Sequence, residues 1–165
     1  MERRLILMRH AKSSWKHAGL ADHERPLNHR GKRDAPCVAR ALLARGWAPG
    51  AVVTSSAERA IATWARMEPV LGELPHTVDE DLYHAGLVAL CDAAARWPAD
   101  VGALLVIGHN PGWEDAVTAL SGVETTMTTG NAALLAGAGA TWDAALDGPW
   151  RLESLLQPKK LPKGG

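Results

Sequence analysis

The chain has 165 residues, of which 47% are hydrophobic and 22% are charged, a size and composition typical of one soluble globular domain. Eighteen Lys and Arg balance eighteen Asp and Glu, so the formal net charge at pH 7 is zero. This balance argues against nucleic acid or a membrane surface as a partner, and no apolar stretch approaches the ~18 residues of a membrane span. Cys37 and Cys91 are isolated, which predicts reduced thiols. With no visible signal peptide, we expect a cytoplasmic protein.

Strands and helices alternate along the sequence. Short apolar runs predict strands over residues 5–8, 51–54, 77–78, 103–107, 132–136 and 150–155. Helices are predicted from an Asn28 cap to residue 44, from a Ser55 or Ser56 cap to residue 71, and over residues 87–96 and 112–120. We expect one domain over residues 1–157 and a disordered tail over residues 158–165.

This alternation predicts an α/β fold with a largely parallel sheet and helices on both faces. In such sheets, ligands bind beyond the carboxyl ends of the strands. Polar residues that directly follow strands are therefore expected to converge on one site.

Three predicted strands end in such residues. The first ends in Arg9-His10. The second continues into residues 55–59 (SSAER), which places Arg59 in the first turn of the next helix, and the strand at 103–107 is followed by Gly108-His109-Asn110-Pro111. Any one of these residues alone is more often an ordinary polar side chain, but two histidines and two arginines at one sheet edge favour a functional site.

The chemistry of these four side chains suits a phosphoryl group. Arginine offers forked, always-charged donors that match phosphate oxygens, so Arg9 and Arg59 are candidate clamps. A neutral imidazole can attack phosphorus as a nucleophile, and a second one can donate to the oxygens that gain charge in the transition state. The helix N-termini behind Arg59 and after His109 would add backbone N–H donors.

Other chemistries fit less well. Neither His10 nor His109 has carboxylate or thiol partners at metal-ligand spacing, so we expect no metal and no cofactor. The sequence contains no GxxxxGK[ST], GxGxxG or GxSxG motif, which argues against nucleotide-binding loops and against a serine hydrolase.

The motifs resemble those of the histidine phosphatase superfamily. The resemblance lies in Arg9-His10 after the first strand, in residues 55–60 (SSAERA) after the second and in residues 108–111 (GHNP). The segments RHAKSSW (residues 9–15) and RPLNHRG (residues 25–31) and the small size are similar to the SixA-type branch, the phosphohistidine phosphatases. The resemblance spans residues 5 to about 155 and implies a single-domain, three-layer, phosphoglycerate-mutase-like sandwich.

The resemblance also implies roles for individual residues. His10 would be transiently phosphorylated, in a phosphate pocket formed with Arg9, Arg59 and His109. Ser13 takes the place of a phosphate-binding Ser, whereas Ala11 replaces the Gly of the familiar motif. The roles of Arg25, Lys12 and His84 are left open by the sequence.

In this superfamily a carboxylic acid protonates the leaving alkoxide of a phosphomonoester. The candidates are the acidic residues 79–81, among which position favours Asp81 first and Glu80 second. A solvated acidic turn is the alternative. A leaving imidazole needs far less proton donation than an alkoxide, so a site without an effective acid would favour phosphohistidine.

We therefore expect a phosphatase that acts through a covalent phosphohistidine on His10, with phosphohistidine in a partner protein as substrate. The alternatives are a small-molecule phosphomonoesterase, acting on a sugar phosphate or a similar compound, and a phosphate-binding module without turnover. An intact pair of histidines argues against the module. The sequence leaves open the physiological substrate and the oligomeric state.

Overall fold

The computed structural model describes residues 1–163 and contains one six-stranded sheet in the order β3-β2-β4-β1-β5-β6. The strands are β1 (Glu2–Arg9), β2 (Ala51–Ser55), β3 (His76–Asp79), β4 (Ala103–Gly108), β5 (Ala132–Ala138) and β6 (Arg151–Leu156). The pairs β1–β4, β2–β4 and β2–β3 are parallel, and β5 runs antiparallel to both of its neighbours. The predicted, mostly parallel α/β sheet is confirmed.

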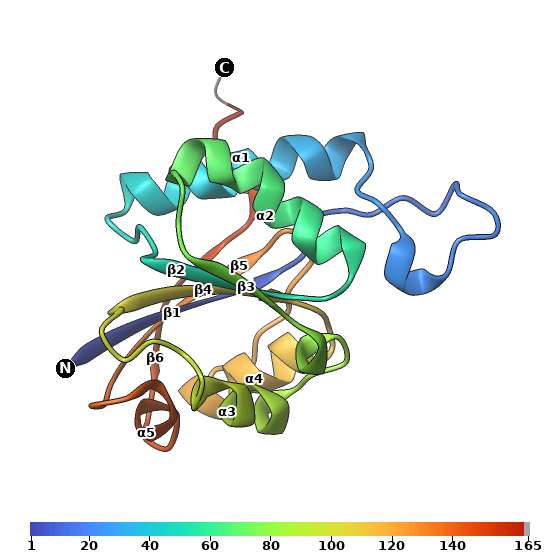
Figure 1. Cartoon of the computed structure of the whole chain (residues 1–165). Coiled ribbons are helices and arrows are strands. Elements are labelled where there is room, and N and C mark those ends of the chain that lie inside the picture. The colour runs from blue at the N-terminus through green and yellow to red at the C-terminus, as the bar shows by residue number, and fades with distance from the viewer. Residues whose placement is uncertain (164–165) are drawn as a thin grey trace.

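Helices cover both faces of this sheet (Figure 1). One face carries α1 (His29–Ala44) and α2 (Glu58–Leu71), and the other carries α3 (Leu87–Ala94), α4 (Gly112–Ser121) and α5 (Trp142–Leu146). Side chains alternate along β1, so Ile6 and Met8 pack under α1 and α2 whereas Leu5 and Leu7 enter the opposite core. The result is the predicted three-layer sandwich. Within residues 1–163, no helix combines the length and the apolar character that crossing a membrane requires.

Helix starts agree with the sequence in one case and differ in another. The Asn28 side chain accepts a hydrogen bond from the Gly31 amide and caps α1, as predicted. The N-cap of α2 is Ala57 instead of Ser55 or Ser56, because Ser55 still belongs to β2. The Ser55 hydroxyl nevertheless lies 3.3 Å from the Ala57 amide, from which it accepts a hydrogen bond. Helix α5 was not predicted, because five residues are too few to show a periodic pattern.

The C-terminal segment corrects another expectation. The chain after β6 forms a short 3-10 helix, η3 (Pro158–Lys160), in which Pro158 is buried. The Lys163 ammonium lies 2.8 Å from the Pro158 carbonyl and 3.4 Å from the carboxylate of Asp34. The predicted disorder is therefore wrong for residues 158–163, since these contacts fasten the segment to α1, and the rest of the predicted tail (164–165) lies outside the described residues.

Candidate active site

The carboxyl ends of β1 and β4 bring His10 and His109 together. Arg9 pairs with Gly108 across these parallel strands, and the His10 amide donates to the Gly108 carbonyl at 3.0 Å. His10 directly follows Arg9 and His109 directly follows Gly108, so the two rings lie side by side. Their centroids are 5.1 Å apart, and the ring planes are inclined by 52°. A side chain at Gly108 is excluded, because a Cβ atom there would lie 2.5 Å from the ring of Trp113. The expected convergence of the two histidines is present in the structure.

The hydrogen bonds of His10 define its protonation. Its Nδ1 lies 2.7 Å from the Ala11 carbonyl, which can only accept, so Nδ1 carries the proton. Its Nε2 accepts a hydrogen bond from Arg59 Nε at 3.3 Å. Burial, and after it the charges of the nearby arginines, lowers the pKa of His10 to about 4. At neutral pH His10 is therefore an uncharged imidazole with a lone pair on Nε2.

Two packing contacts hold the backbone that follows His10. The Ala11 amide donates to Thr63 Oγ1 at 3.0 Å, and this hydroxyl donates to the Arg59 carbonyl at 2.7 Å, so one threonine joins β1 to α2. The start of α1 presses on the next residue, because a Cβ at Gly31 would lie 2.2 Å from the Lys12 carbonyl oxygen. The carbonyl that orients the His10 ring thus lies in a rigid frame.

His109 is held by β2. Its Nε2 lies 2.6 Å from Ser55 Oγ, and its Nδ1 is buried with no hydrogen-bond partner among residues 1–163. Burial, followed by the proximity of His10 and Arg59, lowers the pKa of His109 to about 3. A neutral His109 whose Nε2 accepts from the serine hydroxyl has its remaining proton on Nδ1. That N–H is a free donor beside His10.

Two buried arginines, Arg25 and Arg59, and the partly buried Arg9 lie near the histidines. Arg9 donates to the Met127 carbonyl at 3.0 Å, while its Nε has no hydrogen-bond partner in the described chain. The guanidinium of Arg25 likewise leaves Nε and Nη1 without one. Burial lowers the pKa of both Arg9 and Arg25, and the charge of Arg59 lowers both further. Unsatisfied, mutually repelling donors of this kind fit an oxyanion that would pair with all of them.

Arg25, which the sequence left open, belongs to this cluster. Its charge acts on His10, and its Nη2 donates to Ser13 Oγ at 2.6 Å. The Trp15 ring covers the guanidinium of Arg25, whose Cζ atom lies 3.3 Å from the centroid of the ring. The Ser13 hydroxyl, predicted to bind phosphate, is thus engaged in holding Arg25.

The carboxylate beside the histidines is Asp22, which sequence reasoning missed. It begins a short 3-10 helix, η1 (Asp22–Glu24). Its Oδ2 accepts from Arg59 Nη2 at 3.0 Å and from the Tyr83 hydroxyl at 2.5 Å, and its carbonyl accepts from Arg59 Nη1 at 2.8 Å. The hydrogen bond from Tyr83 is the chief cause that lowers the pKa of Asp22, and Arg59 adds to it. A usable signal was present, because residues 1–33 hold nine Lys and Arg and Asp22 is one of only three carboxylates among them.

The predicted acids are not brought to the histidines. The Asp81 carboxylate is exposed and lies 3.8 Å from Arg96, which also binds Asp79 at 2.6 Å. Glu80 is exposed, and the described residues show no contact between it and either histidine. His84, left open by the sequence, is also exposed, with its ring 4.1 Å from that of Tyr83. The turn at 79–81 faces Arg96 and not the site.

Comparisons with known proteins agree with this geometry. The profile of the histidine phosphatase superfamily (branch 1) matches residues 5–88. An uncharacterized chloroplastic protein of Arabidopsis thaliana is 37% identical over 96% of this chain and 79% of its own length. A structure from Nakamurella multipartitia, provisionally named phosphohistidine phosphatase SixA, superimposes with a TM-score of 0.85 at 26% identity, over 96% of this chain and 97% of that one.

A mycobacterial glucosyl-3-phosphoglycerate phosphatase shares the fold at a TM-score of 0.67 and 18% identity, over 93% of this chain and 98% of that one. The site and these likenesses define a phosphatase fold with histidines at its centre. The chain belongs to the histidine phosphatase superfamily, and its structure is of the SixA type.

Proposed function

We propose that this protein hydrolyses phosphohistidine in a partner protein through a covalent intermediate on His10. The observation that carries the proposal is the state of His10, whose Nδ1 proton is held by the Ala11 carbonyl while Nε2 keeps its lone pair. That lone pair accepts a hydrogen bond from Arg59 Nε, and the nearby Arg9, Arg25 and His109 hold buried donor atoms that have no hydrogen-bond partner within residues 1–163. A nucleophile surrounded by oxyanion donors is what phosphoryl transfer needs.

The reaction has two steps. In the first, His10 Nε2 forms a bond to phosphorus while the bond from phosphorus to the substrate nitrogen breaks, and the leaving imidazole takes up a proton from solvent. The arginines and the Nδ1–H of His109 stabilise the charge on the phosphoryl oxygens. In the second, water attacks phosphorus and loses a proton, the bond to Nε2 breaks, and inorganic phosphate leaves.

The state of Asp22 supports an N–P bond as the one cleaved. Hydrogen bonds from Tyr83 and Arg59 lower the pKa of Asp22, so at neutral pH this carboxyl group is ionised and has no proton to donate. An alkoxide leaving group requires such a donor, whereas imidazole, with a reference pKa of ~6.5, does not. The carboxylate at this site therefore favours a phosphoramidate over an alkyl phosphate.

The covalent step is tested by trapping. Enzyme mixed with phosphorylated substrate is quenched in acid and in alkali and analysed by mass spectrometry, because phosphohistidine survives only the alkali. We expect a phosphorylated His10 peptide in the alkaline sample, and no phosphoenzyme or turnover in His10→Ala. His76→Ala is the matched control, since His76 is exposed on β3. Turnover of normal rate in His10→Ala would refute the covalent mechanism.

The preferred leaving group is tested with two peptides of one sequence that carry phosphohistidine or phosphoserine. We expect the phosphohistidine peptide to have the higher kcat/KM, by roughly 10²-fold or more, the usual contribution of one general acid. Asp81→Asn serves as the second arm and should affect neither peptide, because its carboxylate faces Arg96. A selective loss on phosphoserine would restore Asp81 as the acid. Faster hydrolysis of a sugar phosphate than of either peptide would favour the small-molecule phosphatase.

A further inference from the structure

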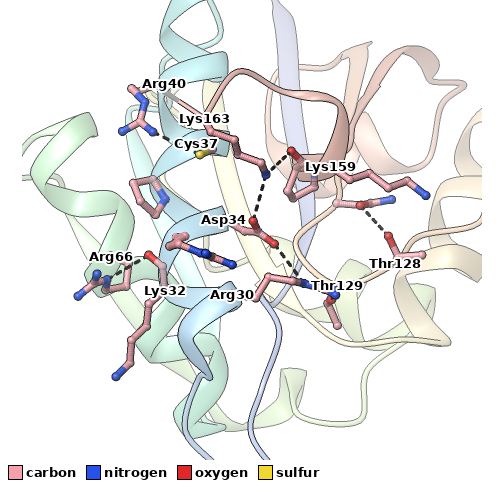
Figure 2. Close-up of a pocket in the computed structure, with 14 residues that line it drawn as sticks. Arg30, Lys32, Asp34, Cys37, Arg40, Arg66, Thr128, Thr129, Lys159 and Lys163 are labelled. Carbon is pink, nitrogen blue, oxygen red and sulfur yellow. Dashed lines mark hydrogen bonds and ion pairs between the residues drawn. The ribbon is translucent and has the colours of Figure 1, made fainter. Parts of the chain in front are cut away.

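A groove of about 710 Å³ lies outside the histidine site, between α1, α2, the loop at 128–131 and the segment after β6 (Figure 2). Its lining holds seven of the chain's eighteen Lys and Arg but only one of its eighteen carboxylates, Asp34. The groove thus concentrates six net positive charges in a protein whose formal net charge is zero. A local excess of this size is an attractive field for an anionic partner.

The single carboxylate is already neutralised. Asp34 is buried and lies 3.6 Å from Arg30 and 3.4 Å from Lys163, and Figure 2 shows it at the centre of the groove between these two cations. Four of the seven cations come from α1, and Arg66 and Lys159 approach from other elements. Lys32, Arg33 and Lys159 are exposed, and none of them has an ion-pair partner within residues 1–163.

One wall of the groove contacts the backbone that carries His10. In the loop that forms one wall, the Gly130 amide donates to the Arg9 and His10 carbonyls, at 3.1 and 2.9 Å. Arg30 and Lys32 also line a second groove of about 560 Å³, which reaches Lys12 and the residues after it. A track of cations therefore runs from η3 across the start of α1 to the segment that follows the nucleophile.

We propose that this basic groove binds an acidic segment of the phosphorylated protein substrate, an inference that rests on the proposed function. Cations spread over several walls fit carboxylates spaced along a polypeptide better than one compact anion. The lining of this groove contains no aromatic side chain on which a nucleic-acid base could stack. Charge complementarity over an extended track therefore selects an acidic polypeptide.

Fluorescence anisotropy with a labelled octaglutamate peptide tests the groove without any catalysis. The full chain is compared with Arg33→Glu/Lys159→Glu, which reverses a charge on two different walls. Arg45→Glu/Arg151→Glu is the matched control, because it changes the net charge equally at exposed positions outside the groove. We expect the groove variant to weaken peptide binding about tenfold and the control to weaken it far less. Binding should also fall as salt rises, since the screening length is only about 8 Å at physiological ionic strength.

The same assay contains the outcomes that would overturn the proposal. Equal weakening by both variants would mean a general charge effect, and absence of binding would remove the groove as a docking site. Tighter, groove-dependent binding of an oligouridylate would identify a nucleic-acid surface, and displacement of the peptide by stoichiometric ATP would identify a small-anion site. Because none of these measurements needs turnover, their failure would leave the covalent role of His10 untouched, and loss of that role would leave the groove result standing.

Discussion

Acidification between pH 6.5 and 4 should destabilise the fold through the two site histidines. The pKa of His10 is lowered to about 4 and that of His109 to about 3, chiefly by burial. In the unfolded chain both would titrate near the reference pKa of ~6.5. The folded state therefore binds fewer protons than the unfolded state in this window. The stabilisation is fully present above pH 6.5 and is lost as the pH falls toward the folded pKa values.

The size of the effect follows from the same values. A pH of about 5 lies roughly 1.5 units below the pKa of an unfolded histidine, so protonation stabilises the unfolded state by about 2 kcal/mol at each of the two histidines. The two sites together give about 4 kcal/mol, a large part of the 5–15 kcal/mol typical of a whole domain. Asp22 does not contribute to the loss between pH 6.5 and 5. Because its pKa is lowered in the fold, its stabilising effect is lost only when the pH falls into and below the ordinary pKa range of a carboxyl group.

Urea unfolding, followed by tryptophan fluorescence in phosphate-free buffer at about pH 7.5 and pH 5, measures this loss. His10→Asn removes one of the two titrations and should lose about 2 kcal/mol less than the parent on acidification. His76→Asn, on the exposed strand β3, should behave like the parent. If His10→Asn lost as much stability as the parent, His10 would not be held neutral in the fold, and the account of its nucleophilic state would fail.

Three further changes test the frame of the site. Thr63→Val should cost about 1–3 kcal/mol in urea unfolding because it leaves the buried Ala11 amide without an acceptor, and an unchanged midpoint would contradict that role. Arg25→Gln should weaken the binding of tungstate, a tetrahedral oxyanion that mimics phosphate, by about 1.5–3 kcal/mol in calorimetry with the fold retained, whereas an unchanged affinity would make Arg25 purely structural. Gly31→Ala should cost about 1–3 kcal/mol and lower turnover, since its Cβ would displace the Lys12 carbonyl, and normal melting with normal activity would refute that close contact.

The parts of the site that lie at strand ends could be predicted from the sequence, and the parts carried by loops could not. Parallel pairing of β1 with β4 fixes His10 beside His109 once both strands are recognised, since each residue directly follows its strand. Asp22 lies in a stretch without periodicity, so the sequence could mark it only as a rare carboxylate among basic residues, and its hydrogen bonds to Arg59 and Tyr83 are what place it at the site. Position near a strand end pointed to Asp81, but its carboxylate lies 3.8 Å from Arg96.

The arginines link substrate binding to the state of the nucleophile. After burial, Arg59, Arg9 and Arg25 each lower the pKa of His10, because a further positive charge beside three guanidinium groups is disfavoured. Arg9 and Arg25 keep donors that are available to phosphoryl oxygens, whereas Arg59 holds His10 and Asp22. A site that binds a phosphoryl group through buried cations therefore keeps its imidazole unprotonated without a separate base.

The carboxylate of Asp22 offsets part of the positive charge of the arginines, since it lies 3.0 Å from Arg59 and 3.6 Å from Arg25. It therefore allows three cations to stay close together before a phosphoryl group binds. Asp22 balances the arginines only when it is ionised, and an ionised carboxylate cannot donate a proton. This agrees with a leaving group that needs no general acid.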